Sequence, residues 1–540
     1  MQLSYLWGAF NSPPLLSLTL SLLFLQFVVP FANAIPVEKS VPLDLFWQFQ
    51  LDPDDEGVKE GWFKQSHKRS EWRMVKVPHT WQVEPGTEEY YGTGWYALEL
   101  GPFDFGPDRD LRLEFDAVYR DTTVWLNGSK IGEHNGSGWT SFSFPLNADW
   151  KSDSTNLLVI RVDNRFSEDA LPYLNSSDWA ADGGIIRSVQ MVSYPRPYID
   201  RILVDSDLSP DLDKAEITVR LSVEGALPEI GRVEARGFIV REGGVDRHPL
   251  TMHHTSDSIV ELRCVVDDPD LWHFDFPNLY RVSAALYSNG RLTHERGSSF
   301  GIRNVEVKNG LFYLNGEPMR LMGVEWMPGS DPRYGMAEPE AIMRRTLQDM
   351  KELNAVLTRF HWQQDPFVFE FCDRNGILVQ EEVPAWGPRT MKGSFDDIQL
   401  SQMKEMITAH YNHPSIYAWG ICNEIRGQSL EAHKFVARGV EIANSLDPSR
   451  LTTWASNSLQ ETPEKDASSL VDFIEWNDYW ESWYGCSLTD LEAKLRRIAQ
   501  AFPEKAHEIA EYGLCECTPK HPEGDTRRLE NLKTHTDSYR

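Results

Sequence analysis

Cysteine is scarce in this chain, with six residues among 540. From Cys264 onward they fall mostly in segments predicted as core strands or helices, which is not the pattern of a disulfide framework. Cys515 and Cys517 are separated by one residue and have no second Cys or His pair at the spacing of a zinc site. We therefore expect no metal site and no cofactor.

Positive charge is also in short supply. Lysine and arginine number 53 against 81 aspartate and glutamate residues, so the net charge is −28. A chain with this balance offers no basic surface for a polyanion. Nucleic acid is therefore not an expected partner.

The first 34 residues contain no charged side chain. An apolar run from Leu15 to Phe31 is followed by Ala32-Asn33-Ala34, a small-x-small triplet typical of a signal-peptidase site. This pattern predicts a signal peptide over residues 1–34 and a secreted protein. A Lys or Arg before the run is missing, and the run is near the lower limit for a bilayer span, so an uncleaved membrane anchor is the alternative. No later segment is apolar and long enough to span, so no stable membrane span is expected after cleavage.

Three glycosylation sequons fit a secreted route. Their acceptor residues are Asn127, Asn135 and Asn175.

Short strands separated by turn residues fill the first half of the chain. Residues 35–196 alternate apolar and polar positions, with Asn127-Gly128 as a hairpin turn, and predict an antiparallel β-sandwich. Residues 197–300 repeat the rhythm at a length suited to an immunoglobulin-like sandwich. The boundary is expected near Ser193–Pro197.

Strands alternate with helices over residues 301–540, which predicts a parallel sheet and a (β/α)8 TIM barrel as the catalytic domain. Seven strands are expected: 319–324, 355–359, 377–382, 416–422, 451–455, 471–476 and 506–511. The sequence stops at Arg540, inside the predicted seventh helix. We therefore expect a barrel that is truncated at its C-terminal end and lacks its eighth strand.

The fourth of these strands ends in Asn423 and Glu424, and the seventh ends in Glu511. Enzymes of this architecture hold their catalytic groups where the strands end. Two convergent carboxylates, one protonated and one ionised, are what cleavage of a glycosidic bond requires. Glu508 is the rival on the seventh strand; it is expected deeper and on the opposite face of the pleat. The alternative for Glu424 is a strand-end residue that simply meets solvent.

Several motifs in order resemble those of glycoside hydrolase family 2, which includes β-galactosidases, β-glucuronidases and β-mannosidases. These motifs are DGGIIRSV at 182–189, FGIRNVEVKNGLFYLNGEPMRLMGV at 300–324, CDRNGILVQEEVPAWG at 372–387, NHPSIYAWGICNE at 412–424 and EIAEYG at 508–513. The resemblance covers nearly all of the chain after residue 34, and it implies that the sandwich at residues 35–196 is a jelly-roll-like, sugar-binding-like domain. It implies a retaining hydrolase of terminal β-linked sugars that works by double displacement on a carbohydrate substrate.

Carried over by position, the resemblance makes Glu424 the general acid/base and Glu511 the nucleophile. It makes Asn423 the donor to the sugar 2-hydroxyl group, and Tyr479 the tyrosine that hydrogen-bonds the nucleophile. Rim packing is the alternative role for Tyr479.

Four further residues are also expected to bind substrate, although the sequence pattern supports them less strongly. Arg359 and His361 resemble a pocket Arg and His, but one residue separates them where the family usually has two. Trp386 and Trp480 follow strand ends, where a flat ring can stack on a pyranose; packing in the core or at the rim is the alternative.

The motifs do not determine which sugar is cleaved. A β-galactosidase ranks narrowly ahead of a β-glucuronidase or a β-mannosidase. Because the eighth strand is expected to be absent, a truncated and inactive carbohydrate-binding protein is the alternative from another class. The sequence does not indicate the oligomeric state.

Overall fold

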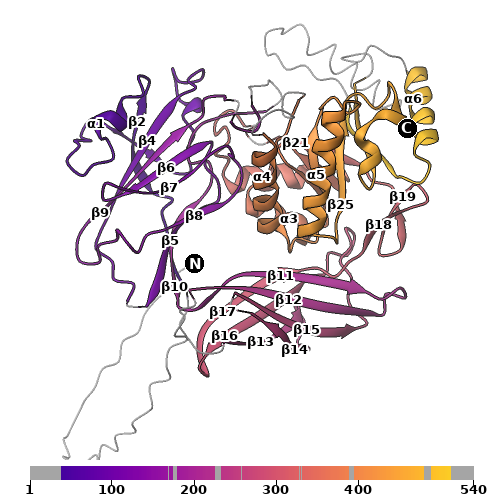
Figure 1. Cartoon of the computed structure of the whole chain (residues 1–540), viewed down its shortest axis with the longest axis horizontal. Helices are drawn as coiled ribbons and strands as arrows, with labels where there is room; N and C mark the ends of the chain where they lie inside the picture. Colours follow the sequence, from indigo (N-terminus) through magenta and orange to yellow (C-terminus); the bar gives the residue numbers. More distant parts are fainter. Residues whose placement is uncertain are drawn as a thin grey trace, which may run out of the picture. The chain divides into compact units, whose positions relative to one another are not determined.

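The computed structural model describes residues 38–106, 108–167, 169–173, 179–225, 233–256, 258–327, 329, 331–387, 395–479 and 488–512. These residues belong to one compact unit, which begins at Pro36. Figure 1 shows them as two regions of strands followed by a region of alternating strands and helices. Some predictions fall outside the described residues. They concern the signal peptide, Asn175, Trp480 and the seventh barrel helix, which is predicted from Thr526 onward.

The first domain is an antiparallel sandwich of two sheets. Its strands are β1 Lys39–Pro42, β2 Phe46–Asp52, β3 Arg73–Lys76, β4 Thr93–Leu100, β5 Arg109–Phe115, β6 Asp121–Leu126, β7 Ser129–His134, β8 Phe142–Pro145, β9 Asn156–Asp163 and β10 Val189–Pro195. One sheet has the order β3-β2-β4-β9-β6-β7 and the other β1-β10-β5-β8. Alternate residues such as Trp47, Phe49 and Leu113 fill the space between them. Asn127 and Gly128 form the predicted β6–β7 turn with positive φ angles of 54° and 92°.

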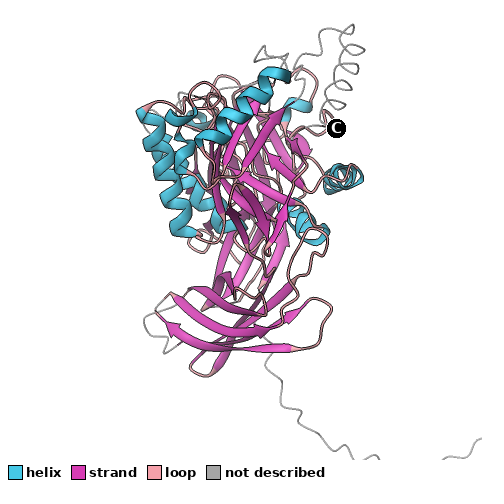
Figure 2. Ribbon diagram, turned by 90° about the vertical axis from the view of Figure 1, so that its right-hand side faces the viewer, coloured by secondary structure: helices cyan, strands magenta, loops and turns pink. Residues whose placement is uncertain are grey.

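The second domain is the immunoglobulin-like domain, and its strands are all antiparallel. They are β11 Tyr198–Leu208, β12 Lys214–Glu224, β13 Val233–Arg241, β14 Arg247–Thr255, β15 Ile259–Asp267, β16 Tyr280–Ser288 and β17 Arg291–Phe300, in the order β11-β12-β15-β14-β13-β16-β17. Its core includes Ile217 and Val219 of β12 and Leu262 of the neighbouring strand β15. The domain is drawn entirely as strands and loops in Figure 2, whereas the helices flank the sheet of the third domain.

The third domain contains seven parallel strands in sequence order. They are β21 Gly323–Trp326, β22 Leu357–Phe360, β23 Leu378–Glu382, β24 Ile416–Asn423, β25 Leu451–Ser456, β26 Ile474–Asp478 and β27 His507–Tyr512. The intervening helices are α2 Glu340–Glu352, α3 Pro366–Asn375, α4 Phe395–His410, α5 Leu430–Leu446 and α6 Leu488–Ala501. This is a nearly closed TIM-type barrel, as the alternation of strands and helices predicts. Within the described residues, β21 and β27 are its two edge strands.

Two barrel strands begin clearly later in the sequence than predicted. The first barrel strand is β21, because Met319 belongs instead to β20 (Glu317–Met319) of a small antiparallel sheet with β18 (Val305–Lys308) and β19 (Leu311–Leu314). The sixth strand begins at Ile474 rather than Val471, after a 3-10 turn at Ala467–Leu470. The shifts place Glu325 and Asn477 inside strands, beside the candidate site.

Strand β24 is buried along all eight of its residues, which explains its continuous apolar sequence. It pairs with β23 on one side and β25 on the other. The register shifts between Gly420 and Asn423, and Glu424 follows with a positive φ of 52°. A left-handed backbone is uncommon for a glutamate and is held here by a hydrogen bond from Glu424 N to Ala455 O, 2.9 Å long.

Candidate active site

The candidate residues lie at the carboxyl ends of five barrel strands. Glu325 comes from β21, Arg359 from β22, and Glu511 from β27. Glu424 follows β24, and Tyr479 follows β26. Parallel strands bring their carboxyl ends to one rim of the barrel, so residues far apart in sequence meet there.

Glu511 is surrounded by hydrogen-bond donors. Its Oε1 accepts from Arg359 Nη1 at 2.7 Å and from Asn423 Nδ2 at 3.4 Å, and its Oε2 accepts from Tyr479 Oη at 2.7 Å. The side chain is 8% exposed. These donors fix the orientation of the Glu511 carboxyl group. The contact that was expected between Tyr479 and Glu511 is present.

Glu424 has a different environment. Burial, and next the negative charge of Glu511, raise the pKa of Glu424, although hydrogen bonds from Asn477 and Trp386 oppose the rise. Asn477 Nδ2 donates to Oε1 at 2.9 Å, and Trp386 Nε1 donates to Oε2 at 3.3 Å. The raised pKa favours a carboxylic acid that can give up a proton. The two carboxyl groups therefore differ in their surroundings: Glu511 is held by three hydrogen-bond donors, and Glu424 is buried beside a negative charge.

Arg359 is a buried cation in a ring of acids. Nη1 contacts Glu325 at 3.0 Å as well as Glu511, Nη2 contacts Glu382 at 3.0 Å, and Nε lies 3.8 Å from Glu475. Burial lowers the pKa of Arg359, but these carboxylates raise it well above its ordinary value. Arg359 is therefore a permanent positive charge that holds the nucleophile candidate in place.

His361 joins the same network. Its Nδ1 lies 3.0 Å from Glu325 Oε1, and its Nε2 lies 3.0 Å from Asn423 Nδ2 and 3.2 Å from Arg359 Nη2. Burial lowers the pKa of His361, but Glu325 and the other nearby carboxylates outweigh it and raise the pKa. Since both nitrogens facing Nε2 are donors, the ring proton belongs on Nδ1, toward Glu325. The one-residue spacing between Arg359 and His361 thus still places both side chains at the site.

The prediction for the orientation of Glu508 is wrong. The pairing of β26 with β27 shifts register between Trp476 and Asn477, so β27 contains one extra residue there. This irregularity turns both glutamates of β27 toward the barrel interior, where Glu508 interacts with Arg359 and accepts from Tyr417 Oη at 2.8 Å. Burial raises the pKa of Glu508 to about 7. Glu508 lies below the rim, so Glu511 remains the candidate nucleophile.

The first domain contributes to the wall of the site. The ring of Trp179 lies 5.2 Å from that of Trp386 and 6.2 Å from that of His361. Arg187, in the DGGIIRSV motif, donates to Trp139 O at 2.7 Å and to the backbone of Gln363, two residues beyond His361. The motif therefore joins the sugar-binding-like domain to the barrel rim.

The predicted glycosylation acceptors differ in their surroundings. Both hydrogen atoms of Asn127 Nδ2 are engaged, with acceptors at Asp149 O and Asn156 Oδ1, each 2.8 Å away. A glycan on this nitrogen would break at least one of these bonds. Asn135 lies on an exposed turn.

One group of side chains has the spacing of metal ligands. Single ligand atoms of Glu325, His361 and Glu511 lie within 4.8 Å of one another. The guanidinium group of Arg359 contacts both glutamates of this group. It supplies the positive charge that the two carboxylates require, so we assign no metal here.

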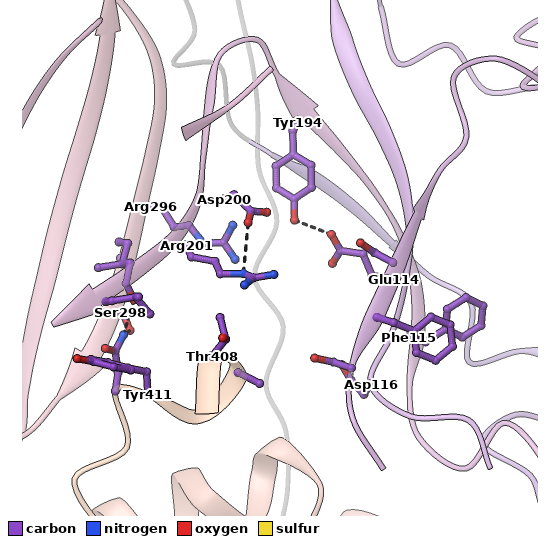
Figure 3. A pocket seen from close by; sticks show the side chains of 18 residues that line it. Glu114, Phe115, Asp116, Tyr194, Asp200, Arg201, Arg296, Ser298, Thr408 and Tyr411 are labelled. Atoms are coloured by element: carbon purple, nitrogen blue, oxygen red, sulfur yellow. Dashed lines mark hydrogen bonds and ion pairs between the residues drawn. The ribbon is translucent and has the colours of Figure 1, made fainter. Parts of the chain in front are cut away.

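A cavity of about 410 Å³ lies elsewhere, between both sandwiches and α4. Figure 3 shows Tyr194 hydrogen-bonded to Glu114 and Arg201 paired with Asp200 at its wall. None of the candidate catalytic residues lines it.

Two residues of the site were not anticipated from the sequence. Asn477 precedes Tyr479 by two positions, and the period of a strand would have placed both on one face. Glu325 lies in a segment with no familiar motif, and only its placement in β21 brings it to the rim.

Three family models match consecutive parts of the chain. "Glycosyl hydrolases family 2, sugar binding domain" matches residues 41–195, "Glycosyl hydrolases family 2" matches 197–303, and "Glycosyl hydrolases family 2, TIM barrel domain" matches 305–518. The chain belongs to glycoside hydrolase family 2. The three matches follow the order of the three domains that the structure contains.

Relatives that are named for different activities resemble the chain. A β-galactosidase of Thermoanaerobacter pseudethanolicus is 30% identical over 77% of this chain and 55% of its own length. A β-glucuronidase of Bacteroides fragilis is 28% identical over 84% of this chain and 67% of its own length. The crystal structure of a Bacteroides uniformis β-glucuronidase superposes with a TM-score of 0.80 and 27% identity, over 93% of this chain and 62% of that one.

The family 2 chain spans just over half the length of the first of these relatives.

Among the described residues, no helix has both the length and the apolar character needed to cross a bilayer.

Proposed function

We propose that the chain is a retaining β-glycosidase in which Glu511 is the nucleophile and Glu424 is the general acid/base. The contrast between the two carboxyl groups carries this proposal. Arg359, Asn423 and Tyr479 donate hydrogen bonds to Glu511, while burial and the charge of Glu511 raise the pKa of Glu424. A carboxylate for attack and an acid for the leaving oxygen are the two groups of a double displacement.

The reaction divides into two steps. Glu511 attacks the anomeric carbon as Glu424 protonates the leaving oxygen, which gives a covalent glycosyl-enzyme. Glu424, now ionised, then removes a proton from water as the water displaces Glu511. Asn423 and Tyr479 contact Glu511 in this arrangement, and we assign them to hold the nucleophile and the adjacent sugar hydroxyl.

The terminal sugar is proposed to be a β-galactoside first, with β-glucuronide and β-mannoside as alternatives. The β-galactosidase of T. pseudethanolicus supports the first choice and the β-glucuronidase of B. fragilis the second. Trp386, beside Glu424, is assigned to the sugar-binding wall. The role of Trp480 in substrate binding remains a prediction. We also propose secretion, on the strength of the uncharged apolar segment at residues 15–31.

The test compares the wild-type chain with Glu511→Gln and Glu424→Gln on aryl β-glycosides. Glu511→Gln should abolish hydrolysis. Glu424→Gln should retain activity only on substrates with activated leaving groups, and azide should rescue it by forming a β-glycosyl azide. Glu352→Gln, on the exposed face of α2, is the matched control for loss of one carboxylate. An α-configured first product would contradict retention, and a wild type that binds sugars without hydrolysing glycosides would favour the binding-protein alternative.

A further inference from the structure

We propose that Glu325 binds a hydroxyl group of the sugar at the cleavage position and selects neutral pyranosides over uronides. This inference rests on the proposed function, because it assumes that Glu511 attacks the sugar. It assigns a role to a residue that no family motif singled out in the sequence.

The position of Glu325 relative to the nucleophile is the first argument. Glu325 Oε1 and Glu511 Oε1 share one nitrogen, Arg359 Nη1, at 3.0 and 2.7 Å. Ligand atoms of the two glutamates lie within 4.8 Å of each other. A sugar ring whose anomeric carbon faces Glu511 must occupy the space next to that carboxylate. Ring substituents of the bound sugar therefore come within reach of Glu325.

The second argument is an open acceptor on Glu325. Its Oε1 faces Arg359 and His361, each 3.0 Å away. Its Oε2 accepts no hydrogen bond from any described part of the chain, and the side chain keeps 15% of its surface exposed. A sugar hydroxyl is a donor that suits this oxygen, and a hydrogen bond to a charged acceptor is among the stronger ones.

Charge provides the third argument. Arg359 faces four carboxylates, so its positive charge is already paired, and His361 directs its ring proton toward Glu325. A uronide brings an additional carboxylate into this acidic pocket. Like charges a few ångströms apart repel strongly where water is excluded. The pocket thus discriminates by repulsion as well as by attraction.

Turnover of matched substrates tests the proposal. The wild type should hydrolyse its preferred neutral aryl β-glycoside with a kcat/KM at least about 100-fold above that for the aryl β-glucuronide. Glu325→Gln should lower kcat/KM for the neutral substrate about tenfold or more. The ratio of kcat/KM for the neutral substrate to kcat/KM for the glucuronide should fall by a similar factor. Glu325→Asp keeps the negative charge, so this variant should keep the preference for the neutral substrate over the glucuronide. Faster glucuronide hydrolysis by the wild type, or an equal loss on both substrates in Glu325→Gln, would overturn the proposal.

Binding measurements separate this inference from the proposed function. If the wild type hydrolyses nothing, the proposed function fails, and calorimetry with D-galactono-1,5-lactone and D-glucaro-1,5-lactone decides the role of Glu325. The neutral lactone should bind the wild type more tightly, and Glu325→Gln should weaken that binding about tenfold or more. The Glu352→Gln control should bind as the wild type does. Tighter binding of the uronic lactone, or no binding of either, would refute the inference.

Discussion

Removal of the Asn477 side chain should displace the alkaline limb of the activity profile to higher pH. Asn477 is fully buried, and its Nδ2 donates to Glu424 Oε1 at 2.9 Å. This bond stabilises the ionised form of Glu424 and lowers its pKa, against the rise caused by burial and by Glu511. In Asn477→Ala, Glu424 should therefore keep its proton to higher pH.

The size of this displacement follows from the lost bond. A hydrogen bond to a charged group contributes about 1.5–3 kcal/mol, and about 1.4 kcal/mol corresponds to one pH unit. Trp386 keeps its bond to Oε2 in the variant, and Glu424 is partly open to water. Both features reduce the stabilisation of ionised Glu424 that is lost with Asn477. The alkaline limb should therefore move to higher pH by about one unit.

The assay is kcat/KM against pH with an aryl β-glycoside, because this parameter reports the free enzyme and the step in which Glu424 acts as the acid. The plateau of Asn477→Ala should also fall, since Asn477 contacts Asn423. Asn444→Ala, on the exposed face of α5, should leave the limb in place. An alkaline limb that stays or moves to lower pH in Asn477→Ala would refute the assignment of Glu424 as the acid held by Asn477.

Three further outcomes can be measured. Tyr479→Phe removes the 2.7 Å bond to the nucleophile and should lower kcat/KM roughly 10- to 100-fold with little change in unfolding temperature. Mass spectrometry of the secreted protein should find a glycan on Asn135 and none on Asn127, whose amide hydrogens are both engaged. Asp447→Asn leaves Arg450 buried and unpaired, and should lower the free energy of unfolding by about 3 kcal/mol in urea. Burial raises the pKa of Asp447, but Arg450 and the hydrogen bonds from Ser449 and Trp419 together lower it below its ordinary value. The wild type should therefore lose this stabilisation only as the pH falls through the lowered pKa, and the variant should lack that acid dependence.

Local pattern determined much of the architecture. A strand buried on both faces must be apolar throughout, so Ile416–Asn423 was recognisable as a central barrel strand, and a turn with two positive φ angles favours Asn-Gly, so the β6–β7 hairpin was recognisable too. Glu424 could be singled out because it follows this barrel strand, and Glu511 because it lies near the end of the seventh strand. The family resemblance added the expected contact of Tyr479 with Glu511.

Tertiary structure alone decided how these groups surround one another. The irregularity in β27 turns Glu508 inward together with Glu511, and no residue pattern in EIAEYG encodes that extra position. Glu325 meets Arg359 and His361 only because the barrel places β21 beside β22. The raised pKa of Glu424 and the hydrogen bonds to Glu511 likewise depend on burial and on donors from distant strands. Strand identity is a local property of the chain, whereas the environment of a carboxylate is set by the side chains that folding brings around it.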